Sequence, residues 1–170
     1  MKATTNIPLA LNRIHRLVSQ MGYKCEIIDK DELFVFQAYA TTDNGDEITI
    51  NINVTANGEN SHIGDGNYLA LEVFIPCNVR SEDDELDICY YIMELITQVD
   101  LITIQYVPEI QQILMSRVDC IDDQLPDSYI INHILQPSIN EFLHIFYLIE
   151  NTTTDIVPSV LTPPSDKYLN

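Results

Sequence analysis

The first regular pattern of hydrophobic residues predicts an amphipathic helix over residues 8–22. Apolar side chains recur there at intervals of three and four residues, so an α-helix gathers them on one face. Pro8 suits the first turn of a helix, and Gly22 is typical of the residue that follows a helix end. The arginines of this segment fall on the other faces, as expected for a helix with one buried side.

A strand pattern replaces the helical one after Gly22 and predicts a meander of three or four antiparallel strands. Asn44-Gly45 is a strong hairpin signal between two of them. Residues 48–55 alternate without a fault, with Ile or Val on one face and small polar residues on the other. One face of this strand is therefore expected to be buried, and the other to meet water or a partner. The expected strands are Lys24–Ile28, Leu33–Tyr39, Asp46–Thr55 and Tyr68–Ile75.

The middle of the chain predicts a second helix followed by a pair of strands. Ser81 and Asp84 have the spacing of a capping box, so a helix is expected from Ser81 to about Gln98. Its apolar residues cover a broad face. Two further strands are expected to pair across a turn at Pro108-Glu109, namely Leu101–Val107 and Gln112–Ile121.

Two helical patterns follow, Tyr129–Leu135 and Ser138–Ile149, with Pro137 between them. A proline inside a helical pattern kinks the helix or starts a new one. The sequence therefore leaves two alternatives, two short helices or one long bent helix. The second pattern is apolar over more than one stripe, and such a helix has to be buried. It either fills the core of one chain or forms the seam of a dimer. The residues concerned are Phe142, Leu143, Ile145, Phe146 and Ile149.

The order of these elements is helix, three or four strands, helix, two strands and helix. Strands and helices that are grouped in this way indicate an α+β fold, with an antiparallel sheet covered by helices on one face. Residues 1–150 are expected to form a single domain, because their number suits one hydrophobic core. Residues 151–170 contain three prolines and no periodicity, which predicts an extended or disordered tail.

Acidic residues far outnumber basic ones, and this imbalance limits the classes of molecule that the protein is expected to bind. The chain has 26 Asp and Glu against 8 Lys and Arg, a formal net charge of −18. Residues 31–150 hold 22 of these carboxylates and only two arginines. Such a surface repels phosphate groups, so we expect neither nucleic acids nor membranes as partners. The densest acidic run favours the start of a helix and is also a candidate partner-binding surface. It consists of Glu82, Asp83, Asp84 and Glu85.

No motif in the chain specifies a reaction, a metal or a cofactor. Phosphate-binding loops usually carry a lysine, and no lysine lies between residues 31 and 166. Asp43–Glu47 lacks the ligand spacing of a calcium loop. The four cysteines are scattered singly and are expected to be small buried residues, although a Cys–His pair formed by folding stays open. The histidines also lack the paired spacing of a zinc site. They are His15, His62, His133 and His144.

Targeting signals are not visible in the sequence. Met1–Pro8 lacks the apolar region of a secretory signal peptide. No stretch approaches the length of uncharged apolar sequence that a membrane-spanning helix needs. A cytoplasmic location is therefore expected.

Several local sequences occur in an order that resembles that of a known family. Met21-Gly22-Tyr23 ends the first helix, the charged turn Asp29–Glu32 separates two strands, and Leu95–Ile104 leads from a helix into a strand. Over roughly residues 7–150 the chain resembles the YbjN-type family of bacterial sensory-transduction regulators, which shares the fold of class I type III secretion chaperones. The loop Ala56–Asn67 and the proline-rich tail depart from the core of that family. The resemblance implies a small acidic dimer that binds other proteins and has no catalytic residues.

These observations lead us to expect a non-enzymatic acidic module that binds other proteins, as a chaperone or adaptor does. Its partner is expected to offer a basic or apolar extended segment, and the protein itself is expected to be a homodimer. Two alternatives stay open at this point. The chain could be a small enzyme or ligand-binding protein whose site is hidden in the sequence, or an acidic mimic of nucleic acid.

Overall fold

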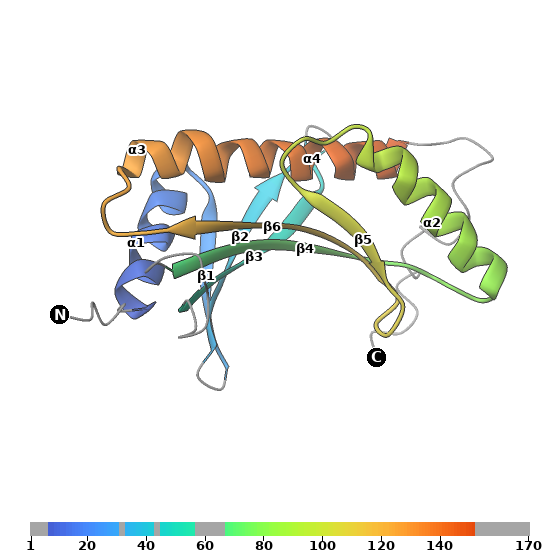
Figure 1. The fold of residues 1–170 in the computed structure, drawn as a ribbon, viewed down its shortest axis with the longest axis horizontal. Coiled ribbons are helices and arrows are strands. Elements are labelled where there is room, and N and C mark those ends of the chain that lie inside the picture. The colour runs from blue at the N-terminus through green and yellow to red at the C-terminus, as the bar shows by residue number, and fades with distance from the viewer. Residues whose placement is uncertain (1–6, 31–32, 43–44, 57–66, 152–170) are drawn as a thin grey trace.

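The structure is a computed structural model that describes residues 7–30, 33–42, 45–56 and 67–151. It confirms the predicted α+β fold, with an antiparallel sheet and helices on one of its faces (Figure 1). Outside the described ranges lie residues 152–170 of the predicted tail, loop residues 57–66 with His62, and Asp43-Asn44 of the predicted hairpin turn. The elements are α1 (Ile7–Gln20), β1 (Lys24–Lys30), β2 (Leu33–Thr41), β3 (Glu47–Ala56), β4 (Asn67–Pro76), α2 (Glu82–Ile96), β5 (Thr103–Val107), β6 (Gln112–Ile121), α3 (Asp127–Tyr129), the π-helix η1 (Ile130–Leu135) and α4 (Gln136–Asn151).

Six strands form one sheet in the order β1-β2-β3-β4-β6-β5, and all neighbours are antiparallel. The first four strands make the predicted meander. β6 then pairs along the whole length of β4, and β5 lies outside β6 at the edge of the sheet. Helix α2 connects β4 to that edge and packs beside β5 (Figure 1).

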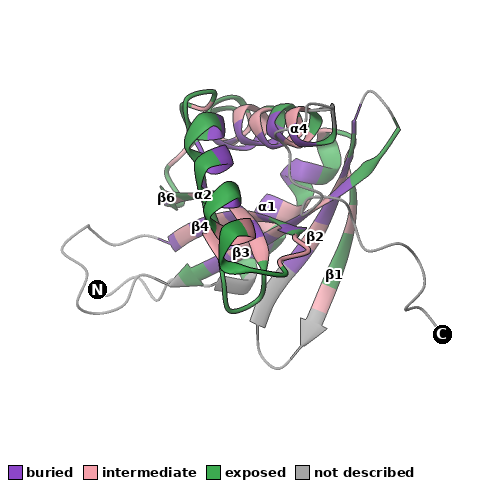
Figure 2. Ribbon diagram, turned by 90° about the vertical axis from the view of Figure 1, so that its right-hand side faces the viewer, coloured by how far each residue is buried: buried purple, intermediate pink, exposed green. Residues whose placement is uncertain are grey.

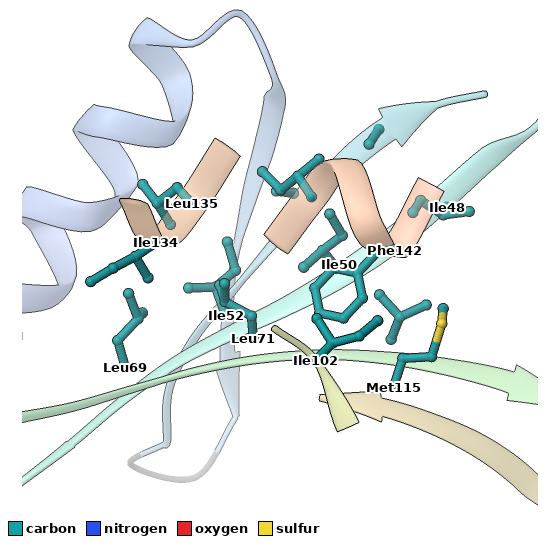
Figure 3. Close-up of a cluster of buried hydrophobic side chains, with 14 of the residues drawn as sticks. Ile48, Ile50, Ile52, Leu69, Leu71, Ile102, Met115, Ile134, Leu135 and Phe142 are labelled. Carbon is teal, nitrogen blue, oxygen red and sulfur yellow. The ribbon is translucent and has the colours of Figure 1, made fainter. Parts of the chain in front are cut away.

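The hydrophobic core lies between the sheet and the helices α1 and α4. The face predicted for β3 is confirmed, because its four Ile and Val side chains are all buried. Across the sheet, Ile52 pairs with Phe36 on β2 and with Leu71 on β4, and both partners are also buried. Figure 3 shows how α4 closes this layer, with Phe142 next to Ile50. The strict alternation of β3 therefore reflects a sheet with one covered face.

Helix α4 fills the core of a single chain. Phe142, Ile145 and Ile149 are buried, and Leu143 and Phe146 pack against the core with part of their surface exposed. Three of these five side chains are therefore packed in the core of one chain, and the other two are covered in part.

The last helical segments, α3, η1 and α4, follow one another without a break, so Pro137 does not separate two helices. Proline has no N–H, and in an α-helix it leaves the carbonyl four residues earlier without its donor. That carbonyl belongs to His133, and the Arg117 guanidinium donates to it at 3.0 Å. The residues just before α4, Ile130–Leu135, also adopt the wider turn of a π-helix. Together these features explain how the helix continues through the proline.

Strand β5 begins two residues later than predicted, at Thr103. The backbone N–H groups of residues 100–102 donate to the Glu141 carboxylate on α4, at 3.1–3.2 Å. The Glu141 carboxylate thus binds backbone N–H groups in the segment where β5 had been predicted to begin. This contact ties the connection after α2 to the helix that covers the sheet.

Candidate functional site

Helix α2 begins with the predicted cap. The Ser81 side chain accepts a hydrogen bond from the Asp84 N–H at 3.2 Å, and the Asp84 carboxylate accepts one from the Arg80 N–H at 2.8 Å. Asp84 is therefore engaged in holding the helix start. Of the four acidic residues predicted to bind a partner, Glu82 and Asp83 are exposed, while Asp84 and Glu85 are partly buried.

The outer side of α2 carries large apolar side chains that no described part of the chain covers. Its inner side is buried against the core, and Figure 2 shows the contrast between the two sides. Sites at intervals of three and four residues share one face of a helix, so the exposed residues form one continuous row. We call this row the α2 stripe. It consists of Leu86, Tyr90, Met93 and Ile96, which are 56%, 67%, 64% and 47% exposed.

Carboxylates run along one flank of the α2 stripe. Asp83, Asp87 and Glu94 are exposed, and their spacing places them on neighbouring positions of the helix surface. Helix α2 contains no lysine or arginine. Contiguous apolar surface with a polar rim is typical of a protein interaction site. The sequence pattern had indicated a broad apolar face on this helix, but could not show that half of it stays exposed.

The basic residues of α1 are bound within the molecule. Arg13 and Arg16 both contact the Asp127 carboxylate, with shortest N–O distances of 2.7 and 2.8 Å. Arg13 also donates to the backbone carbonyls of Asp122 and Leu125. The two arginines thus neutralise Asp127 at the start of α3, and Arg13 also ties the preceding acidic loop to α1. The separation of charge along the sequence is partly cancelled in the fold, whereas helix α2 itself carries no basic residue beside its carboxylates.

A groove lies between the turn that joins β2 to β3 and the outer side of α4. Its volume is about 430 Å³. Nearby, burial and the neighbouring Asp46 carboxyl raise the pKa of Glu150 above its usual value. The sequence analysis did not connect Asp46 with Glu150, because carboxylates are abundant in the chain and these two lie far apart in it. The groove is lined by Thr41, Thr42, Asn140, Leu143, His144 and Tyr147.

We expect Glu150→Gln to stabilise the protein near neutral pH and to have little effect in acid. A carboxyl with a raised pKa holds its proton more tightly in the folded state. Stability is therefore lost as the pH rises from the unfolded value of 4.5 through the folded pKa, and glutamine removes that loss. Urea unfolding at about pH 3.5 and about pH 7 measures the difference.

The matched control for this prediction is Glu72→Gln on the open face of the sheet, at a distance from Asp46. It removes the same charge and should not reproduce the pH-dependent gain. Identical unfolding curves for the wild type and Glu150→Gln at neutral pH would show that the carboxyl pair costs the fold nothing.

The described histidines and cysteines do not assemble into a reactive centre. His15 packs edge-on against Phe36, with ring centroids 5.2 Å apart. Burial raises the pKa of the Cys25 and Cys77 thiols, which disfavours a reactive thiolate. The prediction that all cysteines are buried is wrong for Cys89 and Cys120, which are exposed. Across the described ranges, no three His, Cys, Asp or Glu side chains converge in a way that could hold a metal ion.

Within the described part of the chain, none of the helices has the length and apolar character to span a membrane. Comparison with protein-family models, with curated proteins and with solved structures found no match. The resemblance to YbjN-type regulators and secretion chaperones therefore stays a prediction that rests on the sequence alone.

Proposed function

We propose that this protein is a non-enzymatic module that binds another protein, as a chaperone or adaptor does. The α2 stripe is the observation that carries the proposal. Burying a large apolar side chain contributes about 1.5–3 kcal/mol, so a row of four can supply much of the energy of a protein complex. An exposed apolar stripe on a well-formed helix offers a docking surface for another protein.

The acidic flank specifies the chemistry of the partner. A segment that places apolar residues on the α2 stripe brings its neighbouring side chains close to Asp83, Asp87 and Glu94. Lysine or arginine at those places gives attraction, while acidic residues give repulsion. The occupant we propose is therefore a segment of another protein in which basic and apolar residues are interleaved.

A homodimer is a second proposal, supported by the family resemblance and by the exposed apolar surface. Two copies that met through α2 would bring their acidic flanks together with no basic residue on either helix. Salt screens this repulsion, so such a dimer would strengthen as the ionic strength rises. Sedimentation equilibrium at low and high salt tests this, and a mass of one 19.4 kDa chain throughout would refute the dimer.

We expect a synthetic peptide of interleaved leucine and lysine to bind the α2 stripe, and to bind less tightly and more slowly as salt is added. Opposite charges steer association, and the Debye length falls from about 10 Å at 0.1 M salt to about 3 Å at 1 M. Fluorescence anisotropy and stopped-flow mixing measure affinity and rate. The test variant neutralises the flank and leaves the capping residue Asp84 in place. It carries Asp83→Asn, Asp87→Asn and Glu94→Gln.

Two comparisons separate this surface from the general acidity of the protein. A control variant loses the same charge elsewhere and should keep most of the peptide affinity. Tyr90→Ser keeps every charge but removes the largest apolar contact, and should weaken binding by about tenfold. Equal affinity in the flank variant and the control would contradict the proposal. The control carries Glu47→Gln, Glu72→Gln and Asp123→Asn.

A further inference from the structure

The face of the sheet that is turned away from the helices stays open among the described elements (Figure 1). On β3 the side chains of this open face are all polar, which is usual for a sheet face that meets water. Strands β4 and β6 depart from this pattern. Phe74 lies opposite Leu114, and Ala70 lies opposite Val118, with all four on the open face. Val118 is 62% exposed and Phe74 is 37% exposed.

These side chains form an apolar band along two neighbouring strands, which we call the sheet stripe. Tyr68 and Cys120 continue it, because residues opposite each other on antiparallel strands share a face. One polar pair, Glu72 and Ser116, lies within the band. Apolar side chains grouped on an exposed face with a polar surround are typical of a protein interface. The sheet stripe consists of Tyr68, Ala70, Phe74, Leu114, Val118 and Cys120.

Few charges lie on the open face, although the chain carries a net charge of −18. The carboxylates at its described strand positions are Glu26, Glu47 and Glu72, and Lys24 pairs with Glu26 at 2.9 Å. Most other positions carry amides, hydroxyls or apolar groups. Charged residues are depleted in the cores of protein interfaces. Two copies of this acidic chain would therefore meet with less repulsion through the open face than through α2.

The size and twist of the open face also suit a second copy. The sheet has six strands, and β3, β4 and β6 are each ten residues long. At about 3.4 Å per residue and about 4.8 Å between strands, the face covers roughly 900 Å². An interface of standard size buries about 800 Å² on each partner. Two identical sheets have the same twist, so they can pack face to face with their strands about 30° apart.

We propose that two copies of this chain form a two-fold dimer through the open faces of their sheets, with the sheet stripe as its apolar core. In a two-fold interface the same patch lies on both partners, so the two apolar bands meet. The inference rests on the homodimer proposed above and assigns it to a surface other than α2. The α2 stripe of each copy then stays free, and the dimer offers two such surfaces to a partner protein.

Sedimentation equilibrium of Val118→Glu and Met93→Glu, over a range of protein concentrations, tests the proposal. The two sites are 62% and 64% exposed, so each variant adds the same charge at a surface position. Val118→Glu should weaken the dimer about tenfold or more, because it places like charges in the interface. Met93→Glu on α2 should leave the dimer unchanged. Circular dichroism establishes that both variants are folded, and about 0.15 M salt screens distant carboxylates beyond about 8 Å.

Glu72→Gln tests the same interface in the opposite direction. Among the described residues no basic side chain forms an ion pair with Glu72, so the dimer buries this charge without a partner. Removal of the charge should therefore tighten the dimer. The matched control is Asp123→Asn, which removes the same charge from the loop before α3 and should have a smaller effect.

Three results would overturn the inference. They are a mass of one 19.4 kDa chain at every concentration, a dimer that Met93→Glu breaks and Val118→Glu leaves intact, and equal effects within either matched pair. None of them bears on peptide binding to the α2 stripe, which fluorescence anisotropy measures separately. A peptide that fails to bind α2 would likewise leave the sedimentation result intact.

Discussion

Ile50→Asp is expected to remove most of the stability of the fold. Ile50 is fully buried on β3, beside Ala38 of β2, and Figure 3 shows it near Phe142 of α4. The change loses the burial of an isoleucine and places a carboxyl among apolar side chains with no hydrogen-bond partner. The two costs together come to about 4 kcal/mol or more, against a total stability of about 5–15 kcal/mol for a typical domain. Urea unfolding followed by circular dichroism measures the loss.

Asn51→Asp is the matched control, because the next residue of β3 points to the opposite face. Asn51 Oδ1 accepts a hydrogen bond from Gln37 Nε2 at 2.9 Å, and an aspartate retains this acceptor. The control should therefore cost less than about 1 kcal/mol. Equal losses in the two variants would show that the assignment of the two faces of β3 is wrong.

Arg117→Ala is expected to cost about 3 kcal/mol or more. The guanidinium is mostly buried between β6 and the last helix, and its Nε lies 2.5 Å from the Asp119 carboxylate. It also donates to Ser138 Oγ at 3.1 Å and to the His133 carbonyl at 3.0 Å. Alanine leaves a partly buried carboxylate unpaired, and it leaves the carbonyl opposite Pro137 without a donor. Thermal and urea unfolding measure the loss.

The double variant Arg117→Leu with Asp119→Leu separates these two contributions. A buried ion pair can often be replaced by apolar residues without loss, so the part that comes from the unpaired carboxylate should be recovered. The lost hydrogen bonds from Arg117 to Ser138 and to the exposed His133 carbonyl should keep the double variant about 1 kcal/mol below the wild type. A double variant that is no more stable than Arg117→Ala would show that the ion pair does not explain the loss.

Local patterns in the sequence determined the elements and the buried face of the sheet. The alternation of residues 48–55 predicted which side chains of β3 are buried, because a strand turns successive side chains to opposite faces. The start of α2 followed from the spacing of Ser81 and Asp84, since a cap is formed by residues close in sequence. The grouping of strands and helices was then enough to predict the α+β fold.

Only the tertiary structure decided which apolar helix stays exposed. Both α2 and α4 have more apolar residues than one stripe needs, and for α4 the sequence left core packing and a dimer seam equally open. In the fold, α4 lies across the sheet and buries Phe142 and Ile145, whereas α2 packs beside the edge strand β5 and leaves Tyr90 outside. Periodicity describes the faces of a helix, but the position of a helix relative to the sheet decides which faces meet the core.

The charged contacts also depended on the tertiary structure. Arg13 meets Asp127, burial and the Asp46 carboxyl raise the pKa of Glu150, and Arg117 reaches the carbonyl opposite Pro137. The first two pairs are separated by about a hundred residues, and nothing in the local sequence of either partner identifies the other. An electrostatic contact is set by distance in space, which the chain acquires only when the sheet and the helices pack together.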